Sequence, residues 1–123
     1  NSDLLDIFLD CCNEKLHETE IKWFDEKSLC IVLCTKGYPE FFKKNILIKN
    51  LDKIKLNKNE YCYHAGTKIE NDQIYSNGGR VLNFVCVSQN FSDSRNKVYE
   101  LINLLNWKDG FFRKDIGYKV INK

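Results

Sequence analysis

The stretch Asn77-Gly78-Gly79-Arg80-Val81-Leu82-Asn83-Phe84-Val85-Cys86-Val87-Ser88 places two glycines and an arginine directly before a long run of strand-forming residues. The apolar residues in this run predict a β-strand over residues 80–88. The Asn77-Gly78 pair predicts a tight hairpin turn, because both central residues of such a turn need positive φ. We therefore expect residues 69–76 to form the other arm of the hairpin. A turn does not explain the second glycine or the arginine, so the stretch is also a candidate site.

Three further segments have the composition of strands. Residues 28–35 are apolar on both faces, as in an interior strand, and this segment stops at Gly37-Tyr38-Pro39, which holds the only proline of the chain. Residues 60–64 alternate between polar and apolar types, and residues 46–49 predict a short strand. The sequence therefore predicts several short strands joined by turns, a pattern typical of an antiparallel sheet.

Two helices are predicted on either side of these strands. Ser2 is expected to cap a helix over residues 3–16, and Ser92 is expected to cap a second helix. The second helix carries a clean apolar stripe, formed by Val98, Leu101, Ile102 and Leu105. We predict an α+β fold, with a curved antiparallel sheet flanked by helices.

The bulk composition limits the class of protein. The chain has 123 residues, of which 43% are hydrophobic, so we expect one folded domain. No apolar run approaches the ~20 residues that cross a bilayer, and the first residues resemble no targeting signal, so we expect a cytoplasmic protein that does not contact a membrane. The chain contains no methionine and starts at Asn1, which predicts a piece of a longer protein.

The net charge of +2 is too small to indicate nucleic acid, although the positive charges are unevenly distributed. Six lysines fall in one stretch of the chain: Lys43, Lys44, Lys49, Lys53, Lys55 and Lys58. They form either an ordinary solvated face or a field that attracts anions.

Six cysteines allow disulfides, a metal site or ordinary packing. Cys11 and Cys12 lie on the apolar side of the first predicted helix, and Cys30, Cys34 and Cys86 lie in apolar strands. These surroundings favour free, buried thiols in a reducing cytosol. Cys30 and Cys34 fit zinc-ligand spacing only loosely, and Cys62 with His64 supplies no second well-spaced pair. We therefore assign no metal ligand to this chain.

Several blocks, in this order, resemble one family. The first block is residues 28–33, which lead into Gly37-Tyr38-Pro39. The later blocks are His64-Ala65-Gly66-Thr67, residues 77–82 and residues 113–117. Together they resemble the C-terminal end of phosphoribosylamine–glycine ligase, also called glycinamide ribonucleotide synthetase. The likeness covers nearly the whole chain. It implies that residues 1–27 are a helix and link from the end of an ATP-binding core, and that residues 28–123 are the C-terminal domain.

The resemblance implies an ATP-grasp ligase of purine biosynthesis, whose C-terminal domain is half-barrel-like and similar to a rudimentary hybrid motif. In this family ATP phosphorylates the carboxylate of glycine, and the amine of phosphoribosylamine then attacks the acyl phosphate. The resemblance implies that ATP and Mg²⁺ bind mainly outside this chain. The expected partners are the remaining domains of the same polypeptide, with glycine and phosphoribosylamine as substrates. We assign no catalytic residue to the chain and expect it to be inactive alone.

The same blocks supply the candidate site. Glycine lacks Cβ and lets a backbone approach a ligand or another segment, and a guanidinium can bind a phosphate or carboxylate through two hydrogen bonds. Only three of the 19 Lys and Arg residues are arginines. Arg80 is interpreted either as a contact to substrate or as a structural bridge to a neighbouring domain. The candidate substrate-binding residues are Gly37, Tyr38, Pro39, His64, Gly66, Thr67, Gly78, Gly79 and Arg80.

Arg113, Asp115 and Gly117 are predicted to have structural or interface roles. The chain departs from the family pattern at Glu40 and at Asn50, where glycine is usual. Two other interpretations stay open. One is a free-standing nucleotide- or nucleic-acid-binding module that uses the lysines, and the other is a small thiol or zinc protein.

Overall fold

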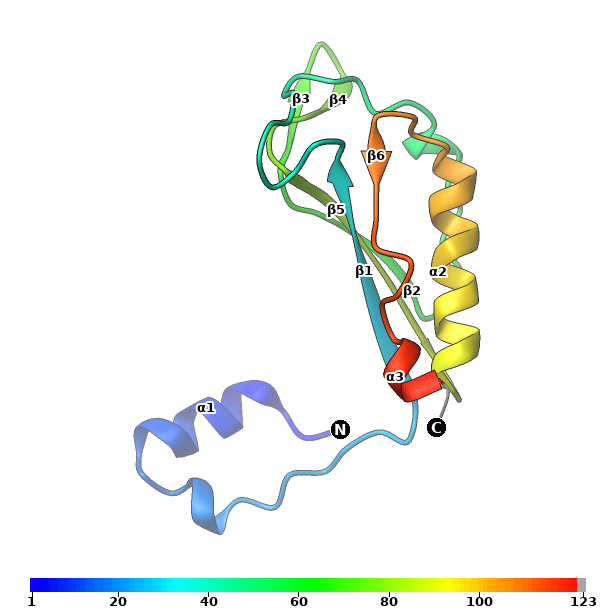
Figure 1. The fold of residues 1–123 in the computed structure, drawn as a ribbon. Coiled ribbons are helices and arrows are strands. Elements are labelled where there is room, and N and C mark those ends of the chain that lie inside the picture. The colour runs from blue at the N-terminus through cyan, green and yellow to red at the C-terminus, as the bar shows by residue number, and fades with distance from the viewer. Residues whose placement is uncertain (122–123) are drawn as a thin grey trace.

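The protein is an α+β domain with two antiparallel sheets, seen in a computed structural model that describes residues 1–121 (Figure 1). The larger sheet has the strand order β2-β5-β1-β6, and the smaller sheet pairs β3 with β4. The strands are β1 (Lys27–Thr35), β2 (Glu60–His64), β3 (Thr67–Glu70), β4 (Gln73–Ser76), β5 (Arg80–Ser88) and β6 (Gly110–Phe111). The predicted α+β class with antiparallel strands and helices is confirmed, including the two long strands β1 and β5.

The core lies between the larger sheet and helix α2 (Phe91–Leu105). Alternate residues of β1 face this core, since Leu29, Ile31 and Leu33 are each at most 5% exposed. Leu29 pairs with Cys86 and Ile31 pairs with Phe84, so the same face of β5 is buried. The predicted stripe of α2 is also buried and closes the core from the other side. The helix begins after Asn90, whose side chain accepts from the Asp93 amide, so the predicted cap at Ser92 is wrong.

The predicted hairpin at Asn77-Gly78-Gly79 is wrong. The left-handed turn lies at Asn71 and Asp72, with φ values of 50° and 57°, and it joins β3 to β4. Residues 77–79 have no positive φ and instead cross from β4 in one sheet to β5 in the other. Residues 46–49 form only an isolated bridge, Leu47 to Tyr75, instead of the predicted strand.

Helix α1 (Leu4–Cys12) and the short helix η1 (Leu16–Glu18) lie apart from the sheets in Figure 1, joined to β1 by an extended link. The side chain of Asp3 accepts from the Leu5 amide at 2.8 Å, so Asp3 caps the helix in place of the predicted Ser2. The apolar side chains of α1 are uncovered, with Leu5 65% and Phe8 56% exposed. The remaining short helices are η2 (Leu51–Lys53) and α3 (Tyr118–Ile121).

All six cysteines are free thiols, but only some of them are buried. Cys34 and Cys86 are buried and Cys62 is half-buried, and burial raises the pKa of both Cys62 and Cys86 to about 11. The expectation of burial is wrong for Cys11, Cys12 and Cys30, which are exposed. The first two lie on the uncovered helix α1, and Cys30 lies on the face of β1 that turns away from α2.

Candidate functional site

Three segments far apart in the sequence meet at the end of β1. The Thr35 amide donates to the carbonyl oxygen of Gly79 at 2.8 Å, and the Thr35 hydroxyl donates to the carbonyl oxygen of Gly78 at 3.0 Å. Thr35 is only 1% exposed, so its amide and hydroxyl donors are shielded from water. The residue that ends β1 therefore holds the glycine pair in place.

Gly66 joins the third segment to the same point. Its amide donates to the carbonyl oxygen of Arg80 at 2.8 Å, and its own carbonyl accepts from the Asn77 amide at 2.7 Å. A Cβ on Gly66 would lie 2.6 Å from the Arg80 carbonyl oxygen and 2.8 Å from Cα of Gly78. Glycine is thus needed at residue 66 for the close contact between the two backbone segments.

The ring of Tyr38 lies directly on Gly79. A Cβ on Gly79 would lie 1.9 Å from Cδ2 of Tyr38, so no larger residue fits there without moving the ring. The ring of Tyr38 also meets Phe42 edge-on, with the ring centroids 5.8 Å apart. The second glycine of the opening stretch is therefore explained by an aromatic side chain of another loop.

The loop that carries Tyr38 is itself tightly folded. Gly37 has φ +90°, and a Cβ there would lie 1.9 Å from the carbonyl oxygen of Phe41, so glycine is required at this position. The next peptide bond, Tyr38-Pro39, is cis. The Gly-Tyr-Pro block therefore forms a compact turn beside the glycine pair.

Arg80 is exposed, and its guanidinium makes no hydrogen bond or ion pair with any residue in the range 1–121. Its positive charge acts on Cys34, where burial raises the thiol pKa and Arg80 partly offsets that rise. The backbone carbonyl of Arg80 is therefore held by the Gly66 amide, while its guanidinium is exposed and unpaired within residues 1–121. Such a group can bind a phosphate or a carboxylate.

Arg113 differs from Arg80 because its charge is already paired. Its Nε and Nη2 atoms donate to the two carboxylate oxygens of Asp115, at 3.0 and 2.5 Å. These hydrogen bonds hold the pKa of Asp115 below its usual range. Gly117 lies elsewhere, at φ +81°, where a Cβ would lie 2.7 Å from Cδ1 of Leu29. Gly117 is thus separate from the three joined loops.

His64 and Thr67 lie at the ends of the loop that contains Gly66. The Nδ1 atom of His64 and the Thr67 hydroxyl share a hydrogen bond of 2.9 Å, and His64 is exposed. This contact closes the turn between β2 and β3. It favours a hydrogen-bonded, structural histidine over an acid–base group.

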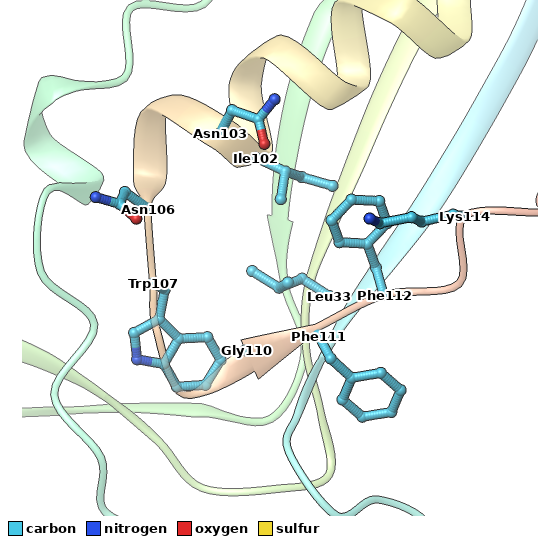
Figure 2. A pocket seen from close by; sticks show the side chains of 9 residues that line it. All are labelled: Leu33, Ile102, Asn103, Asn106, Trp107, Gly110, Phe111, Phe112 and Lys114. Carbon is cyan, nitrogen blue, oxygen red and sulfur yellow. The ribbon is translucent and has the colours of Figure 1, made fainter.

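Two cavities border this region, and the sequence pattern predicts neither. One, of about 370 Å³, brings Tyr38, Pro39 and Arg113 together along an almost wholly apolar wall with Cys30, Val32, Cys34, Phe111, Phe112 and Ile116. The other, of about 320 Å³, lies between the end of α2 and β6 (Figure 2) and is lined by Leu33, Ile102, Asn103, Asn106, Trp107, Gly110, Phe111, Phe112 and Lys114. Trp107 donates from Nε1 to the Leu47 carbonyl at 3.1 Å, which fixes one wall. No predicted substrate-binding residue lines this second cavity.

Asn50 and Glu40, the two residues that depart from the family pattern, differ in their structural surroundings. Asn50 adopts the left-handed conformation, with φ 65°, which asparagine tolerates better than most residues. Its side-chain amide donates to the Leu105 carbonyl at 3.3 Å. Asparagine therefore preserves the backbone shape that glycine would allow. Glu40 is exposed beside the compact turn.

The residues described, 1–121, contain no group of three or more His, Cys, Asp or Glu side chains placed to hold a metal ion. The chain therefore offers no fitting set of ligands for Mg²⁺ in this range. In the same range, no helix is both long and apolar enough to span a bilayer.

The fold and the site together define an α+β domain in which three glycine-containing loops are joined beside one free arginine. Residues 28–119 match the protein family described as phosphoribosylglycinamide synthetase, C domain. The chain belongs to this family, which confirms the resemblance inferred from the sequence.

Similar proteins extend the match beyond that range. The chain is 33% identical to the phosphoribosylamine–glycine ligase of Brucella melitensis over all of its length, covering 29% of that protein. It is 38% identical to the ligase of the same name from Vibrio parahaemolyticus, with 98% of this chain and 28% of that one covered. A crystal structure of the Thermotoga maritima ligase has the same fold, with a TM-score of 0.66 and 23% identity over 89% of this chain and 27% of that one. The chain thus spans less than a third of the length of these relatives.

Proposed function

We propose that this chain is the C-terminal domain of an ATP-dependent ligase that joins glycine to phosphoribosylamine, giving glycinamide ribonucleotide. The observation that carries the proposal is the family match over residues 28–119, together with relatives that all bear the same ligase name. The domain would form one wall of the substrate site, while the remaining domains of the same polypeptide would bind ATP and Mg²⁺.

In this proposal the guanidinium of Arg80 is the group of this domain that contacts the substrate. A free guanidinium beside joined loops can bind the phosphate of phosphoribosylamine or the acyl phosphate that forms on glycine. The six lysines of residues 43–58 are all exposed and add a positive field that favours such anions. Arg113 is paired with Asp115 and is proposed to hold the C-terminal segment instead.

We further propose that residues 1–27 belong to the ATP-binding core and that residues 28–123 form the C-terminal domain. Two observations support this boundary: the family match begins at residue 28, and the exposed apolar side chains of α1 have no cover within residues 1–121. The half-barrel shape is proposed for the domain as well. It is supported by the hydrogen bond from Gly66 to Arg80, which links the loop leading into β3 to the start of β5. We also propose a cytoplasmic location for the chain, while the relative from Arabidopsis thaliana is named as chloroplastic.

The test is an assay of the full-length polypeptide that contains this chain. ADP release should require ATP, glycine and phosphoribosylamine together, and the isolated chain of residues 1–123 should release none. If the full-length polypeptide forms no glycinamide ribonucleotide under these conditions, the proposed activity is wrong. Salt-sensitive binding of RNA by the isolated chain would favour the alternative of a nucleic-acid-binding module.

A further inference from the structure

We infer that Tyr38 is a positioning residue for Arg80: its ring, seated on Gly79, fixes the backbone from which the arginine reaches an anionic substrate group. The inference deepens the proposed function and rests on it, since it assigns the means by which the free guanidinium is held. Tyr38 itself need not touch the substrate.

The contact between the ring and the glycine is the first step of the argument. Gly79 is buried, and the atom that would occupy its Cβ position lies 1.9 Å from Cδ2 and 2.5 Å from Cε2 of Tyr38. The ring therefore covers the Cα atom of the residue that immediately precedes Arg80. Phe42 meets the ring of Tyr38 edge-on and restricts its movement.

The second step is that the other sides of this backbone are already held. Thr35 binds the carbonyl groups of Gly78 and Gly79, and Gly66 binds the carbonyl of Arg80. The ring of Tyr38 closes the side that these hydrogen bonds leave open. The peptide groups around Arg80 are therefore fixed, whereas its guanidinium is exposed and unpaired within residues 1–121.

The third step concerns the part of Tyr38 that matters. Its hydroxyl forms no hydrogen bond with the residues in the range 1–121, so the planar ring accounts for its contacts there. A fixed backbone reduces the entropy that an arginine loses when it binds an anion. Loss of the ring should therefore weaken binding of the anionic substrate without removing the guanidinium.

The experiment uses the full-length ligase with Tyr38→Ala, Gly79→Ala, the double variant and Arg80→Ala. A displaced binding group can cost up to about 100-fold, and we expect the two single variants to raise the KM for phosphoribosylamine about tenfold. The KM for ATP should stay unchanged. Because Ala at residue 38 removes the clash with a Cβ at residue 79, the double variant should be no worse than Tyr38→Ala alone.

Further variants separate positioning from a general structural effect. Tyr38→Phe keeps the ring and should rescue most of the loss in KM, whereas Tyr38→Leu, which is apolar but not planar, should not. Tyr118→Ala removes an exposed tyrosine of α3 and is the matched control for aromatic truncation. Thermal unfolding identifies any variant that fails to fold, and Tyr38→Leu then stands in for Tyr38→Ala.

The outcomes distinguish the inference from the proposed function. If Arg80→Ala leaves every KM and kcat unchanged, the role proposed for Arg80 is wrong. If Arg80→Ala raises the KM but folded Tyr38→Ala, Tyr38→Leu and Gly79→Ala do not, the positioning role of Tyr38 is overturned and that of Arg80 survives. Equal changes in the KM for ATP and for phosphoribosylamine would also overturn it, because they indicate a general disturbance.

Discussion

The hydroxyl of Thr35 donates to the carbonyl oxygen of Gly78 across 43 residues of sequence, at 3.0 Å. This hydrogen bond joins the end of β1 to the segment that enters β5. Because Thr35 is buried, its hydroxyl cannot turn to water and needs the Gly78 carbonyl as its hydrogen-bond acceptor. Loss of this hydrogen bond should therefore lower the stability of the fold.

Thr35→Val keeps the shape of the side chain but removes the donor. The hydrogen bond to the Gly78 carbonyl is part-buried, and a typical intramolecular hydrogen bond contributes about 0.5–1.5 kcal/mol, so we expect the free energy of unfolding to fall by about that amount. Urea denaturation of the chain measures it. Thr35→Ser retains the hydroxyl and is the matched control, which should lose less. Equal stability of Thr35→Val and the parent chain would show that the hydrogen bond contributes nothing.

Gly66→Ala tests the contact between the two backbone segments. Its Cβ would lie 2.6 Å from the Arg80 carbonyl oxygen, and relief of such overlap costs about 1–3 kcal/mol of stability. Gly78→Ala is the control, because its Cβ would meet Cα of Gly66 at 3.2 Å, which a small shift accommodates. Thermal denaturation should rank Gly66→Ala below Gly78→Ala. The reverse order would contradict the close approach at Gly66.

The cysteines should fall into two classes of reactivity. Cys11 and Cys12 are exposed, whereas burial raises the pKa of Cys62 and Cys86 to about 11 and also raises the pKa of Cys34 and of Cys30, although the side chain of Cys30 is exposed. At pH 8 the raised pKa values keep the buried thiols protonated, and only the thiolate attacks a disulfide reagent. We expect the thiols of Cys11 and Cys12 to react quickly with Ellman's reagent in the folded chain, and all six thiols to react after unfolding. Fast reaction of all six in the folded chain would refute this burial pattern.

The ion pair of Arg113 and Asp115 predicts a small dependence of stability on pH. Arg113 lowers the pKa of Asp115 below that of the unfolded chain, so the stabilisation is present above the unfolded pKa and lost as pH falls through the folded pKa. Both side chains are exposed, and pairs of this kind contribute little. The difference in unfolding free energy between the parent chain and Asp115→Asn should therefore be small at pH 7 and vanish at low pH. A difference that grows on acidification would contradict the assignment.

The sequence predicted the features that depend on local periodicity. The apolar runs of β1 and β5 and the stripe of α2 report burial directly, because one face of a strand or helix must turn to the core. The residues that cap the two helices were harder to predict from the sequence. Asp3 lies beside Ser2 and Asn90 lies near Ser92, and the side chains of all four residues can accept from a helix amide. Sequence alone does not choose between such neighbours.

The candidate site was predicted as a set of residues but not as an arrangement. Asn77-Gly78 has the letters of a hairpin turn, yet Asn71 and Asp72 take the positive φ values. The need for glycine at residue 79 comes from Tyr38, and that at residue 66 comes from Gly78 and Arg80. These contacts join residues far apart in the sequence, so a local sequence pattern cannot predict them. The exposed thiols were missed for the same reason, since the cover over α1 and over Cys30 depends on tertiary packing.

The central claim is that the guanidinium of Arg80 contacts an anionic group of the substrate. The most direct measurement is calorimetric binding of glycinamide ribonucleotide, which carries the phosphate, to the full-length polypeptide and to Arg80→Lys. Lysine keeps the charge but lacks the planar pair of donors, so we expect Kd to rise about tenfold. Arg95→Lys is the control, because Arg95 lies over the ring of Tyr99 on α2. An unchanged Kd for Arg80→Lys would contradict the claim.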